Sequence, residues 1–361
     1  MTAASIIGLG YLLPEKAQVQ PSFTSGTSSN FISKLMESSS IQFSSTQRYA
    51  LQGRLFFDYN GDGKQEEDEP PVQNAKVQIA DAVDNSKIIA EVLTDSSGDY
   101  KANVPAGSYQ LFIRPDTSNP ENPNFRYMCR SNAEFRNIWQ GYPLTVAGDG
   151  RFDVGLMEGF LTLPMLSDTE IDVKYYVDLD PRTDPEDIRD WMGGRKTYKG
   201  HPGTDLLMDH KTIVASAPGY LIAAVSGWPN YSYNVPSNWA TAGNFIGIYH
   251  NNGYSSWYEH LDSIEVEEVW PVLPPLGYGL RLAPVNRGDV IAVSDWTGTE
   301  RGTQPHVHFQ TNVVEGTDVT SNPIDPFRDL LYNKFLGTPL FSPKSDKISL
   351  WTKDNDPKYY E

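Results

Sequence analysis

The chain has 361 residues, which is enough for two domains of ordinary size, each with a core of its own. Its formal net charge is −17, whereas binding to phosphate groups needs clustered Lys and Arg; the composition therefore argues against a nucleic-acid partner and against attachment to anionic surfaces. The 29 Gly, 26 Pro, 8 Trp and 20 Tyr favour a turn-rich β protein over a helical one. Cys129 is the single cysteine, so no internal disulfide can form and any zinc site would use nitrogen and oxygen ligands.

The N-terminal segment, residues 1–48, has two open interpretations. Ala4 to Leu13 is apolar and is followed by charged residues, an order that resembles the end of an export signal, although the basic region in front of it is missing. We favour a clipped export signal over an ordinary N-terminal segment. Residues 18–48 are rich in Ser, Thr and Gln and predict a flexible arm. No stretch reaches the roughly 20 apolar residues of a membrane helix, so no transmembrane segment is expected.

A twelve-residue acidic loop follows the first predicted strand, Leu51 to Phe57. Acidic or amide side chains stand at loop positions 1, 3 and 5, glycine at position 6 and glutamate at position 12, which is the pattern of a calcium-binding loop. The expected calcium ligands are Asp58, Asn60, Asp62, the carbonyl group of Lys64, Glu66 and a bidentate Glu69. Helices flank an ordinary loop of this kind, whereas here a strand precedes it and Pro70-Pro71 follows it. The alternative is an acidic surface turn that binds no metal.

Short strands are predicted after this loop, at residues 77–79, 88–92, 100–104 and 109–113. The calcium loop and the turn Thr94-Asp-Ser-Ser-Gly-Asp-Tyr100 together resemble the B-repeat domain of bacterial surface adhesins. The resemblance implies an immunoglobulin-like β-sandwich over residues 50–158 that binds structural calcium and serves as a stiff spacer. Residues 116–140 are longer than that pattern, and no structure is predicted for them.

Residues 159–189 are expected to form a linker and a lead-in strand, Ile171 to Leu179, with a short helical turn at 185–192. The last domain, residues 190–361, has strand-like runs at 213–217, 220–225, 245–250, 255–260 and 290–293. Asn251-Asn252-Gly253 is a hairpin signal between two of these runs. The whole chain is therefore expected to be mainly β.

The stretch Pro305-His306-Val307-His308-Phe309 places two histidines one residue apart in a predicted strand. Successive side chains of a strand point to opposite faces, so His306 and His308 share one face. Such a pair alone is more often two half-exposed histidines than a metal site. Upstream, Pro202-Gly203 prevents a helix between His201 and Asp205. With one of the downstream histidines these two residues give two nitrogens and one carboxylate, a three-ligand set typical of catalytic zinc.

Three motifs in this order resemble the lysostaphin-type zinc metallopeptidases, which are peptidoglycan endopeptidases with an antiparallel β-sheet core. The motifs are Gly-His-x-Gly-Thr-Asp from Gly200, Tyr-x-His-Leu from Tyr258 and Pro-His-Val-His-Phe from Pro305, and the resemblance covers residues 190–332. It implies that His201, Asp205 and His308 bind zinc. It also implies that His260 and His306 are the catalytic pair and that Tyr198 supports the oxyanion.

Several aromatic residues and histidines fall outside these motifs. The cluster of Trp228, Tyr231, Tyr233 and Trp239 either lines a groove for sugar or peptide or packs in the interior. His210 is expected to be exposed, and His250 ends a strand with no expected ligand role. The segments 228–242 and 271–284 are longer than the corresponding turns of the family. This difference leaves the substrate open but does not affect the expected metal site.

The predicted function is a zinc-dependent endopeptidase that hydrolyses peptide bonds in peptidoglycan stems or cross-bridges. Its location is expected to be extracellular, periplasmic or cell-wall associated. Two alternatives stay open, a non-catalytic wall-associated regulator and a calcium-dependent adhesion protein. All five expected ligand and catalytic histidine or aspartate positions are filled, which favours the enzyme.

Overall fold

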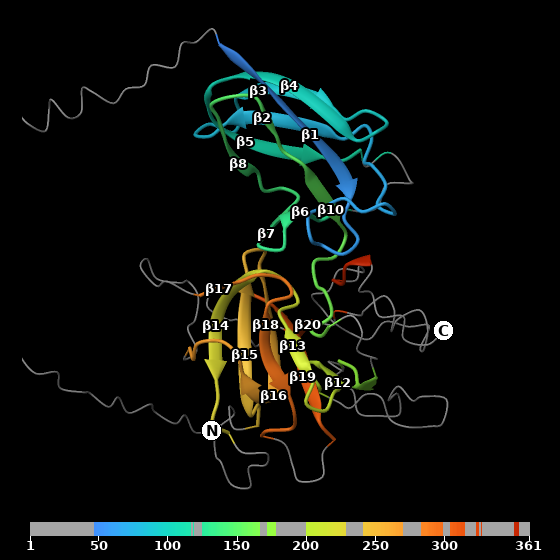
Figure 1. Cartoon of the computed structure of the whole chain (residues 1–361), viewed down its shortest axis with the longest axis vertical. Helices are drawn as coiled ribbons and strands as arrows, with labels where there is room; N and C mark the ends of the chain where they lie inside the picture. Colours follow the sequence, from blue (N-terminus) through green and yellow to red (C-terminus); the bar gives the residue numbers. More distant parts are fainter. Residues whose placement is uncertain are drawn as a thin grey trace, which may run out of the picture. The chain divides into compact units, whose positions relative to one another are not determined.

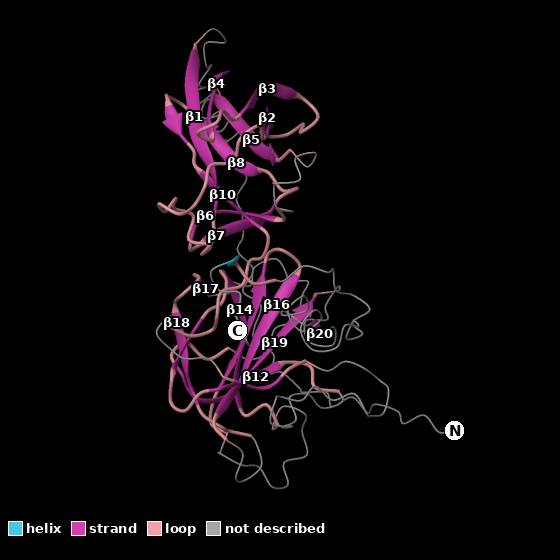
Figure 2. Cartoon of the chain, turned by 90° about the vertical axis from the view of Figure 1, so that its right-hand side faces the viewer, coloured by secondary structure: helices cyan, strands magenta, loops and turns pink. Residues whose placement is uncertain are grey.

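The computed structural model describes residues 47–116, 118, 125–166, 172–177, 200–228, 241–269, 283–298, 304–314, 323–324, 326 and 350–353. All of them belong to one compact unit, Ser45–Glu361. Every named element among them is a β-strand and helical geometry is limited to Lys353, which confirms the expected mainly β fold (Figure 2). The helical turn expected at 185–192 lies outside the described residues. The described part also contains no helix long and apolar enough to cross a membrane.

The N-terminal domain is a sandwich of two sheets (Figure 1). Its strands are β1 (Arg48–Phe57), β2 (Lys76–Asp81), β3 (Ile88–Leu93), β4 (Asp99–Pro105), β5 (Gly107–Arg114), β6 (Tyr127–Ser131), β7 (Glu134–Asn137), β8 (Tyr142–Val146), β9 (Gly150–Arg151) and β10 (Val154–Met157). One sheet has the order β4-β1-β10-β6-β7, with β9 paired to β1, and the other has the order β3-β2-β5-β8. The strands predicted between residues 51 and 113 are all present.

The alternation of buried and exposed residues explains why these segments form strands. In β4, Tyr100, Ala102 and Val104 are buried, whereas the residues between them are exposed. Leu111 and Ile113 of β5 contribute to the same hydrophobic core. Burying one large apolar side chain stabilises the fold by about 1.5–3 kcal/mol, so this period of two fixes which face of each strand turns inward.

Part of the segment 116–140, for which no structure was predicted, forms the hairpin of β6 and β7. Its residue Cys129 is fully buried, and burial raises the pKa of the thiol to about 12, so the thiol is protonated at neutral pH. Tyr127, Cys129 and Phe135 do not join the sandwich core. They belong to the hydrophobic core of the C-terminal domain, which this hairpin therefore extends.

The C-terminal domain is built on one ten-stranded sheet. Its strands are β11 (Val173–Tyr175), β12 (Thr204–Leu207), β13 (Thr212–Val214), β14 (Gly219–Val225), β15 (Asn244–His250), β16 (Tyr254–Ile264), β17 (Pro284–Val285), β18 (Val290–Ser294), β19 (His306–Val313) and β20 (Pro323–Ile324). The main order is β11-β12-β19-β16-β15-β14-β17, with β18 paired to β13 and β16, and β20 paired to β19. The predicted hairpin at residues 251–253 joins β15 to β16.

Residues expected to form a linker are buried where the two domains meet. Phe160 and Leu161 are fully buried, and both donate their backbone N–H groups to the carbonyl oxygen of Leu350, at 2.7 and 2.8 Å. The ring of Phe160 stacks on Phe135 with 5.4 Å between centroids and contacts Tyr254 at 5.3 Å. The hydrophobic cluster is therefore continuous from the β6–β7 hairpin into the C-terminal sheet.

His250, at the end of β15, lies in this junction. It is fully buried, its Nδ1–H donates to the Pro218 carbonyl oxygen at 2.9 Å, and its Nε2 lies 3.0 Å from the Ser256 hydroxyl. Its ring contacts Phe160 with 5.5 Å between centroids. Burial lowers the pKa of His250 from 6.5 to about 4, because the apolar surroundings disfavour the charged imidazolium.

This pKa makes the stability of the chain depend on pH. Between pH 6.5 and pH 4 the unfolded chain binds more protons than the folded one. The contribution of His250 is therefore complete above pH 6.5 and is lost on acidification, by about 3 kcal/mol. In urea unfolding of the metal-free chain, His250→Gln should lose less stability than wild type between pH 7 and pH 4. The exposed His210→Gln should behave as wild type. Equal losses in His250→Gln and wild type would contradict the assignment.

Candidate metal centre

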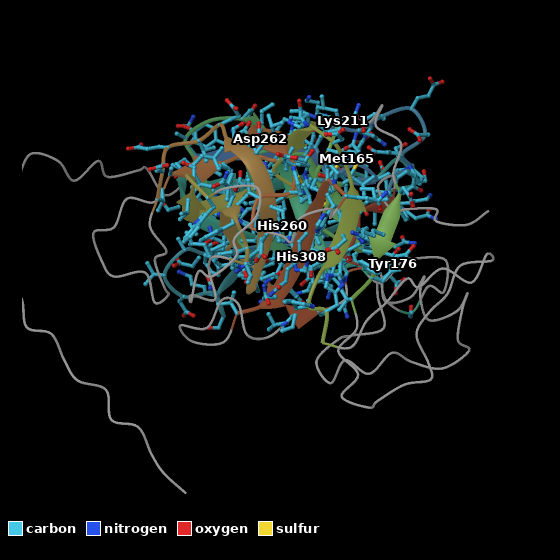
Figure 3. The ribbon with its side chains drawn as sticks, turned by 90° about the horizontal axis from the view of Figure 1, so that it is seen from below. Met165, Tyr176, Lys211, His260, Asp262 and His308 are labelled. Atoms are coloured by element: carbon cyan, nitrogen blue, oxygen red, sulfur yellow. The ribbon has the colours of Figure 1, made fainter. Side chains whose placement is uncertain are left out.

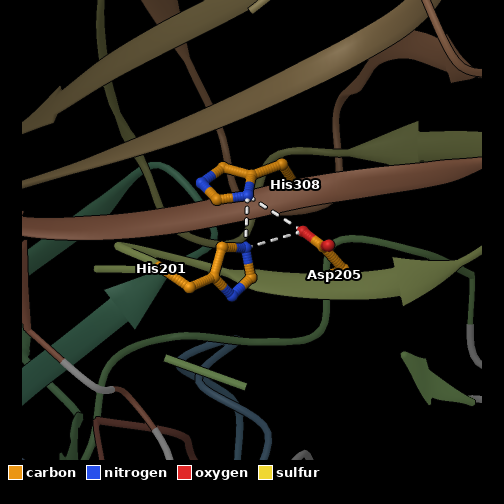
Figure 4. Close-up of side chains that lie close together, drawn as sticks. All are labelled: His201, Asp205 and His308. Carbon is orange, nitrogen blue, oxygen red and sulfur yellow. Dashed lines mark hydrogen bonds and ion pairs between the residues drawn. The ribbon is translucent and has the colours of Figure 1, made fainter. Parts of the chain in front are cut away.

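Two neighbouring strands bring the expected ligands together. β12 and β19 are antiparallel, and Asp205 lies directly opposite His308 in their register. Side chains of directly opposite residues lie on the same face, and His306 shares that face because it is two residues from His308. His201 lies just ahead of β12 and reaches the same point. Figure 3 shows His308 beside His260 of β16, and Figure 4 shows the side chains of His201, Asp205 and His308 at close range.

The side chains of His201, Asp205 and His308 converge (Figure 4). His201 Nε2 lies 3.1 Å from Asp205 Oδ1 and 3.1 Å from His308 Nδ1. His308 Nδ1 lies 2.9 Å from Asp205 Oδ1. His201, Asp205 and His308 are only 1%, 4% and 6% exposed. The three side chains that would hold an ion are therefore buried.

The surroundings orient these groups for a metal. His201 Nδ1–H donates to the Tyr176 carbonyl oxygen at 2.8 Å, which leaves the Nε2 lone pair facing the centre. Gly203 makes room for His308, because a Cβ atom at Gly203 would lie 2.4 Å from His308 Nε2. Two imidazole nitrogens and one carboxylate oxygen form a donor set that suits zinc, and among the described residues this cluster has three members, which leaves a fourth position open as at a catalytic zinc. The residues present therefore fit a zinc ion.

The electrostatics of the centre favour a positive charge. Burial opposes ionisation of Asp205, but hydrogen bonds with His201 and His308 hold the pKa of its carboxyl well below the usual range. Burial also opposes protonation of His308. The hydrogen bond with Asp205 and the charges of Glu259 and Asp205 overcome this effect and raise the pKa of His308 to about 9. A metal ion would take the place of that proton.

His260 and His306 lie beside the three ligand candidates. Their rings are 4.8 Å apart between centroids, and His306 Nε2 lies 3.8 Å from Asp205 Oδ2. Each donates its Nδ1–H to a backbone carbonyl oxygen at 2.8 Å, His260 to Thr297 and His306 to Gln304. Burial and the neighbouring histidines lower the pKa of His260 to about 3, and burial lowers the pKa of His306. Both imidazoles are therefore neutral at pH 7 and able to accept a proton at Nε2.

A β-bulge in β16 explains how His260 joins this group. Glu259 lies opposite His308 in the register of β16 and β19, so Glu259 faces the site and simple alternation would turn His260 away. The register with β15 shifts between the Tyr258 and Leu261 pairs, and His260 has a φ of 64°. A bulge of this kind re-aims one side chain, and such strain is typical of functional sites.

Sequence reasoning missed two contributors. Alternation along β16 would have indicated Glu259, whose pKa is raised by burial. The Tyr176 carbonyl leaves no sequence signal, because any residue can supply a backbone oxygen.

The other candidate residues have mixed outcomes. Tyr198, Tyr231, Tyr233 and Trp239 lie outside the described residues. Trp228 is half-buried and packs against the cluster of Phe245 and Trp257, which favours the packing interpretation for that residue. The side chain of His210 is 62% exposed, as predicted. His210 forms a second convergent trio with Asp209 and Asp295, two members of which are exposed.

The acidic loop after β1 is folded around its own side chains. Asp58 accepts hydrogen bonds from the amides of Gly61 and Gly63 at 2.5 and 2.9 Å, and Glu69 accepts from Tyr59 and Glu66 at 2.6 and 3.0 Å. Asp58 and Glu69 are 2% and 3% exposed. Burial raises their pKa values to about 6 and about 8. Two buried carboxylates beside Asn60 and Asp62 fit a hard cation such as calcium.

Comparison with known proteins assigns both domains. The family model described as peptidase family M23 matches residues 199–326, and the model described as SdrD B-like domain matches residues 49–124. The chain carries an M23 peptidase domain. An SdrD B-like domain precedes it, which confirms both expected resemblances.

Individual proteins are similar over parts of the chain. Colossin-A of Dictyostelium discoideum is 35% identical over 85 residues, which are 23% of this chain and 1% of that protein. The catalytic domain of the antimicrobial peptidase lysostaphin from Staphylococcus simulans is 26% identical, with 43% of this chain and 89% of that chain covered and a TM-score of 0.28. A zinc-containing peptidase from Vibrio cholerae is 22% identical, with 60% and 55% covered and a TM-score of 0.30. TM-scores of this size establish no shared fold by themselves, so the family matches carry the assignment.

The close approach at Gly203 gives a test of the metal centre. Gly203→Ala should displace the His308 ring and weaken zinc binding by about tenfold or more, as loss of an orienting contact does. Competition with a chromogenic chelator measures the affinity. Gly150→Ala is the control, because a Cβ atom there meets nothing within 4 Å. Unchanged zinc affinity in Gly203→Ala would contradict the arrangement.

Proposed function

We propose that this chain is a zinc-dependent endopeptidase that hydrolyses peptide bonds in peptidoglycan stems or cross-bridges. The observation that carries the proposal is the convergence of His201, Asp205 and His308 beside two neutral histidines, in a domain of an M23 peptidase. A structural zinc site would have four protein ligands, whereas the described part of the chain contributes three here, which leaves a position for water and substrate. The protein is proposed to act outside the cytoplasm, at or near a cell wall.

Each side chain has a proposed role. His201, Asp205 and His308 would hold the zinc ion, which when bound would lower the pKa of a water molecule and polarise the scissile carbonyl group. His260 and His306 each offer an unprotonated Nε2, since the carbonyl groups of Thr297 and Gln304 hold their Nδ1–H. These histidines accept the proton of the attacking water and return it to the leaving amine.

We also propose that the acidic loop binds one structural calcium ion. Asp58, Asn60, Asp62, the Lys64 carbonyl, Glu66 and Glu69 are the proposed ligands. The burial of Asp58 and Glu69 supports this: burial raises the pKa of both carboxyl groups because their ionised forms are poorly solvated, and a bound cation would stabilise those ionised forms. The B-like domain is then a calcium-stiffened unit attached to the peptidase.

Digestion of purified peptidoglycan tests the enzymatic proposal. Mass spectrometry of the soluble products should show new peptide termini that appear with the wild-type chain and disappear when a chelator removes zinc. Intact cross-links after incubation with a zinc-loaded chain would favour the non-catalytic regulator. Binding to whole cells that needs calcium and proceeds without hydrolysis would favour the adhesion protein.

The ligand and catalytic histidines should separate by mutation. His308→Ala should lose zinc, because it removes one of three ligands, whereas His260→Ala should keep zinc and lose activity by at least about a hundredfold. Elemental analysis and a peptide-cleavage assay on the same preparations measure both quantities. If His260→Ala also emptied the site, the division of roles between these histidines would be wrong.

Calcium should stabilise the full chain by mass action. An ion that binds only the folded state contributes about 2.7 kcal/mol at a hundred times its dissociation constant. The melting temperature should therefore rise with calcium, and Asp62→Ala should abolish most of the rise. The exposed neighbour Asp68→Ala is the matched control, because Asp68 is not an expected ligand. No rise in the wild-type chain would leave the loop as an acidic turn.

A further inference from the structure

Arg287 of the M23 domain reaches the acidic loop of the B-like domain. It follows β17 and is 6% exposed. Its backbone N–H donates to the Asn132 carbonyl oxygen of the β6–β7 turn at 2.9 Å. Its Nη1 donates to the carbonyl oxygens of Phe160 and Ser216 at 2.8 and 3.1 Å. These bonds fix the guanidinium at the junction of the two domains.

The rest of the guanidinium is aimed at the loop. Nε and Nη2 are buried and have no hydrogen-bond acceptor among the described residues. A Cβ atom at Gly61 would lie 2.8 Å from Arg287 Cζ, 2.9 Å from Nη2 and 3.1 Å from Nε. The guanidinium therefore lies directly against Gly61, the fourth residue of the loop 58–69. Gly61, with a φ of 78° and no side chain, permits this approach.

The contact between Arg287 and the loop brings a positive charge close to acidic side chains. An arginine stays protonated inside proteins, and a buried cation without a counter-charge is strongly destabilising. Burial lowers the pKa of Arg287, whereas nearby groups, among them Asp58 and Asp62 of the loop, favour its charged form; Glu66 and Glu69 lie in the same loop. On its other side the guanidinium donates from Nη1 to the backbone carbonyl oxygens of Phe160 and Ser216, which carry no net charge.

We propose that calcium and Arg287 share one set of loop carboxylates, so that calcium binding in the B-like domain is coupled to the packing of the M23 domain. This inference rests on the proposed calcium site. Without calcium, Arg287 is the buried counter-charge of the loop and holds the loop against the M23 domain. With calcium bound, calcium and the guanidinium of Arg287 both lie close to the same carboxylates. Each cation then weakens the attraction between these carboxylates and the other cation. Because such coupling is reciprocal, Arg287 lowers the calcium affinity of the loop.

Calcium titration of the full-length chain tests the coupling. Arg287→Gln removes the charge but keeps an amide that can donate to the Phe160 carbonyl, and it should bind calcium about fivefold more tightly than wild type. Arg287→Lys keeps the charge and should bind about as wild type does. Arg151→Gln is the surface control. Arg151 lines the cleft beside Gly63 and Lys64 but is paired with Asp153 at 2.8 Å, so its loss should change the affinity by less than about twofold.

Isothermal titration calorimetry in calcium-free buffer gives the affinities, and zinc content with circular dichroism verifies the fold of each variant. Calcium affinity of Arg287→Gln equal to or weaker than wild type would overturn the proposal, as would equal tightening in Arg287→Lys. Arg287→Met replaces Arg287→Gln if the latter does not fold, with the same expectation. A wild-type chain that takes up no calcium at millimolar concentration would overturn the calcium site itself, and the coupling with it.

Discussion

The antiparallel register of β12 and β19 is the constraint on which the site depends. It places Asp205 opposite His308, while Val307 and Phe309 on the other face of β19 are fully buried in the core. A slip by one residue would turn both histidines of β19 into the core and bring the apolar residues to the site. The hydrophobic pattern and the ligand pattern therefore specify the same register. His201 lies only three residues before β12, so the same register also brings it close to Asp205 and His308.

Much of this arrangement could be predicted because it follows from local rules. Alternation predicted the strands of the sandwich and the shared face of His306 and His308, and spacing predicted the acidic loop. The position of His260 depends on a bulge that no propensity indicates, since its φ of 64° is imposed by the pairing of β16 with its neighbours. The β6–β7 hairpin was not predicted because several of its buried residues pack into the hydrophobic core of the C-terminal domain. Local sequence patterns do not indicate such contacts between domains.

The junction between the domains combines an apolar core with a buried charge. Phe160 and its aromatic neighbours make the hydrophobic cluster continuous, so the B-like domain is packed onto the peptidase through its β6–β7 hairpin. His250 and Arg287 are two buried polar side chains of this junction, and each is satisfied partly by backbone carbonyl oxygens. Hydrophobic burial makes the contact stable, whereas these two groups make it sensitive to protons and to the charge of the acidic loop.

We propose that His201, Asp205 and His308 hold a catalytic zinc ion. X-ray absorption at the zinc edge, on the chain purified without chelator, tests this most directly. We expect one zinc per chain with two imidazole nitrogens and oxygen ligands at about 2.0–2.2 Å, one oxygen coming from a carboxylate and the others from solvent. A sulfur ligand, a shell of four imidazoles or a chain that takes up no zinc would contradict it.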